Sequence, residues 1–225
     1  MGLFGTVSDM IAKSSDADLL TALDATSYKE TTKTLLIQRI RQSDQKLTIA
    51  KNNYGNGISV KGILTNVSGY HFLKRIDLKQ ETGKSWDDNA CIPPTTNIDP
   101  LENCIFFHAK ADGAAKGCRA GFTVQVLDKD SVLRGTISVA WENPYVGNFV
   151  YCCMVSKNQD NLQACLNHCD KSSESKIIGD VTIQLDENKI KQFITVNVKA
   201  DNQSTAYILI GIKTDDMVRQ VYGDL

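Results

Sequence analysis

Apolar positions in the first 50 residues follow the period of an α-helix. Near the start they form one stripe, made by Leu3, Phe4, Val7, Met10 and Ile11. Ser15 and Asp16 are suited to cap a second helix, and a third apolar cluster runs from Leu35 to Leu47. We expect residues 16–50 to pack as helices on the body of the domain. The shorter stripe at 3–13 is equally suited to a loosely held amphipathic segment.

After residue 52 the hydrophobic period changes to two, which is typical of half-buried strands. Strands are predicted at 58–64, 70–78, 104–109, 121–127, 132–141, 147–156, 177–185, 193–198 and 206–212. A hairpin connection is expected at 128–131 and a short helix at 159–168. The pattern predicts a mainly β fold: an antiparallel β-sandwich at 51–225, an N-terminal amphipathic helical segment at 1–50 and one or two peripheral helices.

Charge and hydrophobicity exclude two classes of protein. The 225 residues carry 25 basic and 26 acidic side chains, a formal net charge of −1. A nucleic-acid-binding protein would carry a basic excess, so no nucleic-acid partner is expected. The longest apolar run, 149–155, is far shorter than the roughly 20 residues of a membrane-spanning helix.

The N-terminus bears on localisation. It lacks a basic segment and an uninterrupted apolar core, so we expect a cytoplasmic protein, or one that is secreted or bound to a target-cell membrane if a leader was removed. Met1 to Thr6 also fit the pattern for myristoylation of Gly2.

Seven cysteines leave at least one thiol unpaired in a monomer. The best metal candidates are Cys152 or Cys153 with Cys165, His168 and Cys169. Adjacent strand residues point to opposite faces, so only one of the first two can face the later group. The alternatives are a disulfide to Cys169 and reduced packing cysteines, and we expect no bound metal.

Catalytic motifs are weak. The chain has three histidines, no Gly-x-Ser-x-Gly segment and no complete P-loop. We therefore predict no catalytic residues, no cofactor and no enzyme activity. Aromatic side chains instead cluster around Asn143-Pro144: Trp141, Tyr145, Phe149 and Tyr151. Such residues suit a lipid headgroup or choline, and equally suit the core if their sheet face is internal.

The ordered set of segments resembles the actinoporin-like pore-forming cytolysins, whose fold is shared with fungal fruit-body lectins. The resemblance is carried by the segments at 73–86, 104–107, 110–121 and 121–141, and by the run Asn143 to Phe149. It implies a protein that docks on membrane lipid, oligomerises there and inserts an N-terminal helix to form a pore, causing haemolysis and ion transport.

The resemblance also implies site residues. Pro144, Tyr145, Phe149 and Tyr151 would contact the headgroup of sphingomyelin or another phosphocholine lipid, and Leu3, Phe4, Val7, Met10 and Ile11 would enter the membrane. The family usually has paired tryptophans in the stretch where this chain has Tyr151-Cys152-Cys153, and residues 162–170 lack its tyrosines. These departures favour the alternative, a non-lytic lectin-like module that binds a glycan or a protein.

Overall fold

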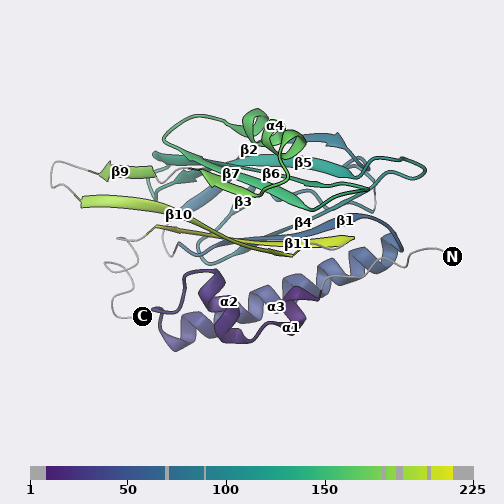
Figure 1. Ribbon diagram of the computed structural model, residues 1–225. Helices are drawn as coiled ribbons and strands as arrows, with labels where there is room; N and C mark the ends of the chain where they lie inside the picture. Colours follow the sequence, from purple (N-terminus) through teal and green to yellow (C-terminus); the bar gives the residue numbers. More distant parts are fainter. Residues whose placement is uncertain are drawn as a thin grey trace.

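The computed structural model describes residues 9–68, 71–88, 90–178, 181–185, 190–201 and 204–214. Two β-sheets face each other, three helices cover the outer face of one sheet, and a fourth helix covers the other (Figure 1). The predicted β-sandwich with helical additions is confirmed. No helix within these ranges is both long and apolar enough to cross a bilayer.

Sheet I has five strands in the order β4-β1-β11-β10-β9. Their bounds are β1 Ser59–Asn66, β4 Asn103–Ala109, β9 Val181–Leu185, β10 Ile190–Asp201 and β11 Thr205–Thr214. Neighbouring strands are antiparallel except for β1 and β11, which run parallel.

Sheet II has six strands in the order β3-β2-β5-β6-β7-β8. Their bounds are β2 Phe72–Thr82, β3 Asn97–Ile98, β5 Cys118–Leu127, β6 Leu133–Asn143, β7 Val150–Ser156 and β8 Lys176–Ile178. Only β7 and β8 are parallel. The main core lies between the two sheets, with Phe106, Phe122 and Trp141 at its centre.

The helical layer consists of α1 (Met10–Lys13), α2 (Asp16–Ala22) and α3 (Glu30–Tyr54). The Ser15 hydroxyl accepts a hydrogen bond from the Asp18 backbone N–H, and Asp18 caps Ser15 in return, so α2 begins where the sequence predicts. A second core joins these helices to the outer face of sheet I. Burying this face gives the N-terminal segment its stability, because short helices are marginal alone.

A charged pair lies inside this second core. The Lys61 ammonium of β1 is 3.2 Å from an Asp44 carboxylate oxygen and 3.1 Å from the Thr48 hydroxyl, both on α3. It also lies 5.1 Å from the ring centre of Tyr207 on β11. The Lys61 side chain is only 2% exposed, so α3 and sheet I are joined by a buried ion pair as well as by apolar contacts.

Helix α4 (Leu162–Lys171) covers the outer face of sheet II. Its start is fixed by the Asp160 carboxylate, which accepts hydrogen bonds from the Thr123 hydroxyl at 2.7 Å and the Leu162 N–H at 2.9 Å. Cys152 packs with Cys165 and Cys169 beneath this helix, while Cys153 faces the main core. The two adjacent cysteines therefore point to opposite faces, as the strand pattern predicts.

Candidate functional site

The β6–β7 turn exposes two large apolar side chains at one end of the sandwich. Tyr145 is 62% exposed and its neighbour Val146 is 85% exposed. Pro144 precedes them and is half-buried, and Gly147 follows with a φ of 122°, a conformation that favours glycine. We call residues 144–148 the tip turn.

The tip turn is held firmly from below. The Asn143 side-chain amide donates to the backbone oxygens of Ser59 at 3.0 Å and Ser204 at 3.1 Å, which anchors the turn to sheet I. Phe149 is buried directly after the turn. Gly117 lies so close that a Cβ there would be 1.8 Å from the Asn143 carbonyl oxygen. The exposed pair therefore projects from a rigid support.

The β4–β5 loop, residues 110–117, brings positive charge to the tip turn. The Lys110 ammonium lies 5.6 Å from the ring centre of Tyr145, within the range of a cation–π contact. The Tyr54 hydroxyl at the end of α3 donates to the Lys110 carbonyl at 3.1 Å and fixes this residue's backbone. Lys116 is exposed on the same loop. Aromatic, aliphatic and cationic groups thus share one end of the molecule.

Two further lysines support the loops around this end. Lys84 pairs with Asp112 at 3.2 Å and Asp88 at 3.6 Å, and the hydrogen bond to Asp112 raises the pKa of the Lys84 ammonium. Lys51 donates to the carbonyl oxygens of Gly55 at 2.7 Å and Gly57 at 3.0 Å. Burial, helped by the nearby Lys61 charge, lowers the pKa of Lys51 to about 8.

The sequence-predicted headgroup residues do not all lie on the surface. Pro144 and Tyr145 belong to the tip turn, whereas Phe149 is buried and Tyr151 is half-buried, with ring centres 6.3 Å apart. Sequence reasoning missed Val146 and Lys110. Both lie in loops, and their proximity depends on β4–β5 and β6–β7 connections that share one end of the sandwich.

The predicted membrane-inserting residues are placed only in part. Leu3, Phe4 and Val7 lie outside the described residues. Met10 and Ile11 belong to α1, where both are buried in the second core. The Arg41 guanidinium on α3 donates to the carbonyl oxygens of Ile11 and Ser14. In this state α1 is docked against α3.

The thiols and imidazoles considered for chemistry are mostly enclosed. All seven cysteines are free and buried, and burial raises the pKa of the Cys153 and Cys169 thiols. His168 contacts the Glu174 carbonyl at 2.9 Å rather than joining a cysteine group. Within the part of the chain that the structure describes, no three His, Cys, Asp or Glu side chains gather as a metal site requires.

A protein of known structure shares this fold. The crystal structure described as lipid binding protein Nakanori is 18% identical, matches with a TM-score of 0.60, and covers 86% of this chain and 94% of its own. Two more distant matches were found. IP-1A from Alcaligenes faecalis is 13% identical with a TM-score of 0.40, and the match covers 72% of this chain and 94% of IP-1A. The RahU protein in complex with TRIS is 8% identical with a TM-score of 0.37, and the match covers 69% of this chain and 95% of RahU.

Among curated proteins, none matches the chain. The model of one protein family, described as Nakanori-like protein, matches residues 14–210. That span includes α2, α3, sheet II, the tip turn and all of sheet I except the last residues of β11. The resemblance to actinoporin-like cytolysins thus holds at the level of a related fold, and the chain belongs to the Nakanori-like protein family.

Proposed function

We propose that this protein binds membrane lipid through the tip turn. The observation that carries the proposal is the exposed pair Tyr145 and Val146, projecting from a rigid support beside Lys110. A tyrosine suits the boundary between headgroups and hydrocarbon, a valine enters the acyl region, and lysines meet lipid phosphates. The Nakanori structure, described as that of a lipid binding protein, supports the proposal.

The proposed target is a phosphocholine lipid such as sphingomyelin. Its choline group would approach the face of Tyr145 that Lys110 does not cover, and the lipid phosphate would accept from lysine ammonium groups. Pro144 shapes the approach to this site. Phe149 and Tyr151 take a supporting role beneath the surface in this proposal.

Replacing both Tyr145 and Val146 by serine is expected to weaken vesicle binding at least about tenfold. Withdrawing two large side chains from the membrane removes more than the about 1.4 kcal/mol that a tenfold change requires. Flotation with vesicles of sphingomyelin and cholesterol measures the effect. Val132→Ser is the matched control, because Val132 is 48% exposed in the β5–β6 turn, at the opposite end of the sheet. Equal loss in both variants would contradict docking through the tip turn.

Pore formation is a further step of the proposal, in which subunits gather on the bilayer and the N-terminal stripe enters it. Met10 and Ile11 would first have to leave the second core and break the Arg41 contacts. A variant lacking residues 1–13 is expected to float with vesicles but release no trapped dye. If the intact protein floats yet releases no dye from any lipid mixture, the non-lytic binding module is favoured instead.

A further inference from the structure

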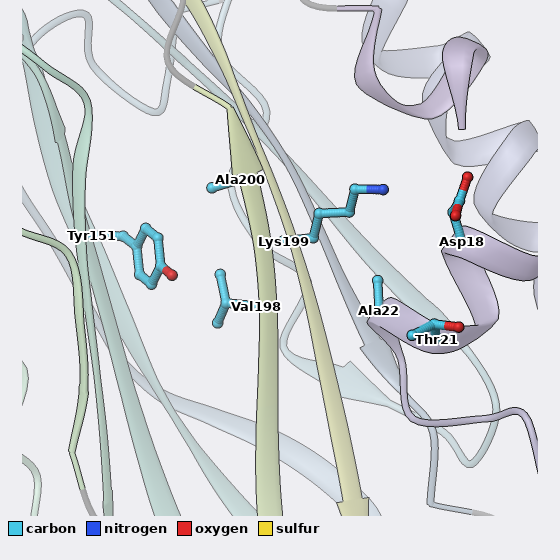
Figure 2. A pocket seen from close by; sticks show the side chains of 7 residues that line it. All are labelled: Asp18, Thr21, Ala22, Tyr151, Val198, Lys199 and Ala200. Atoms are coloured by element: carbon cyan, nitrogen blue, oxygen red, sulfur yellow. The ribbon is translucent and has the colours of Figure 1, made fainter. Parts of the chain in front are cut away.

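A groove of about 530 Å³ runs between α2 and β7 along strand β10 (Figure 2). It is lined by Asp18, Thr21, Ala22, Tyr151, Val198, Lys199 and Ala200. The last three are consecutive in one strand, where successive side chains point to opposite faces. A groove touched by all three must therefore open onto the edge of the strand rather than onto one of its faces.

Over half of its length, that edge of β10 has no neighbouring strand within the part of the chain that the structure describes. On this side β9 pairs only with Ile190–Ile194, while β11 pairs with β10 on the other side as far as Asp201. Among the described strands none pairs with residues 195–200 at the groove. The backbone N–H and C=O groups on this side of residues 195–200 consequently point into the groove. They can form hydrogen bonds with an added strand, as at any sheet edge.

The two walls of the groove differ in character. Val198 and Ala200 extend toward Tyr151 of β7, whereas Lys199 extends toward α2 (Figure 2). A compact ligand would touch one wall. An added β-strand would place alternate side chains against each wall.

We propose that a second copy of this chain occupies the groove with its own β10 edge. Residues 196, 198 and 200 are apolar and residues 197 and 199 are polar. A β10 strand of a second copy would therefore place apolar side chains on the Tyr151 side of the groove and polar side chains on the α2 side. Antiparallel pairing about a twofold axis at Val198 sets apolar residues against apolar ones. It also sets Lys199, whose ammonium donates to the Ser14 hydroxyl of its own chain at 3.0 Å, opposite the polar Asn197 of the second copy. The contact is self-complementary, as a twofold interface demands.

The proposed pairing determines where the two tip turns lie. The Ser204 carbonyl just beyond β10 accepts from Asn143, so the carboxyl end of β10 adjoins the tip turn. Antiparallel strands therefore send the two tip turns to opposite ends of the dimer. If the tip turn binds lipid, as the proposed function holds, the dimer bridges two membranes.

Light scattering coupled to size exclusion tests the dimer in the absence of lipid. The intact protein is expected to dimerise with increasing concentration, and Val198→Lys is expected to weaken dimerisation at least about tenfold, because it sets two buried lysines opposite each other. Val132→Lys, on the exposed turn, is expected to dimerise normally. A monomeric intact protein at all accessible concentrations would overturn the proposal.

Cross-linking tests the pairing even if Val198→Lys fails to fold. All native thiols are buried, so Val198→Cys adds one cysteine at the edge. Copper phenanthroline is expected to give a covalent dimer of this variant and none of Val132→Cys. Dimers in both or neither would count against the pairing at β10.

Vesicle clustering, followed by turbidity, then tests the bridging. Clustering by the intact protein, lost in Val198→Lys while flotation persists, supports the bridging dimer. A dimer that does not float refutes lipid binding and leaves the β10 pairing intact. A dimer that floats without clustering vesicles refutes the opposed arrangement.

Discussion

Asp44→Ala is expected to lower the free energy of unfolding by about 3–5 kcal/mol, the largest stability effect of any single substitution considered for this protein. The Asp44 carboxylate is the counter-charge of Lys61, whose ammonium lies 3.2 Å away beneath α3. Among the described residues, alanine would leave that ammonium buried with only the Thr48 hydroxyl and the Tyr207 ring as partners. An uncompensated charge at such depth costs several kcal/mol.

The matched variants are Lys61→Met and the double variant Lys61→Met with Asp44→Leu. Methionine retains most of the lysine stem's packing, and Asp44 is partly exposed, so its carboxylate regains some hydration once Lys61 is gone. Lys61→Met is therefore expected to cost less than Asp44→Ala. The double variant, with both charges replaced by apolar groups, is expected to recover most of the loss.

Urea unfolding at pH 7 measures all three variants. A loss below about 1 kcal/mol for Asp44→Ala, the scale of exposed ion pairs, would mean that the pair is solvated rather than enclosed by the helical layer. Because the pair joins α3 to β1, the same experiment reports how firmly the N-terminal helices are docked on sheet I.

The pair also illustrates what the sequence conceals. A period of two predicts a strand from Ile58 onward, and an alternating strand normally turns its polar side chains to water. In the structure every residue of β1 is buried, Lys61 among them, because α3 covers the outer face of sheet I. The strand itself is predicted by the local hydrophobic pattern. Whether its outer face is buried depends on α3, a helix from another part of the chain.

Strand pairing across long distances has the same consequence. The apolar stretch at 177–185 predicts one strand, but the structure has β8 at Lys176–Ile178 in sheet II and β9 at Val181–Leu185 in sheet I. Local hydrophobicity does not reveal that the chain changes sheets there. For the same reason the sequence does not reveal the edge of β10 that no described strand pairs with, although the alternation of its residues is easily recognised. The position of Tyr145 in an exposed turn, by contrast, follows from its immediate sequence neighbours and needs no contact from elsewhere in the chain.

Acidification from pH 7 to pH 4 is expected to destabilise the protein, with His108 contributing about 3 kcal/mol of the loss. His108 of β4 is fully buried between the sheets, where its ring stacks on Trp86 at 4.8 Å and approaches Trp141 at 6.2 Å. Burial lowers the pKa of His108 to about 4, and the main chain at Lys84 opposes this shift. Burial likewise lowers the pKa of His71 to about 4.

The sign follows from proton binding in the two states. Between pH 6.5 and about 4 the unfolded chain carries a protonated histidine while the folded chain keeps it neutral, so the unfolded state binds more protons and stability falls as the pH falls. Above pH 6.5 neither state binds the proton and the contribution is constant. His108→Phe keeps an aromatic ring against Trp86 and removes this pH-dependent contribution. Between pH 7 and pH 4 the unfolding free energy of the variant should therefore fall by about 3 kcal/mol less than that of the unaltered protein. Urea unfolding of both proteins at pH 7, 5.5 and 4 measures the difference, and parallel pH profiles would show that His108 is already charged or hydrated in the folded protein.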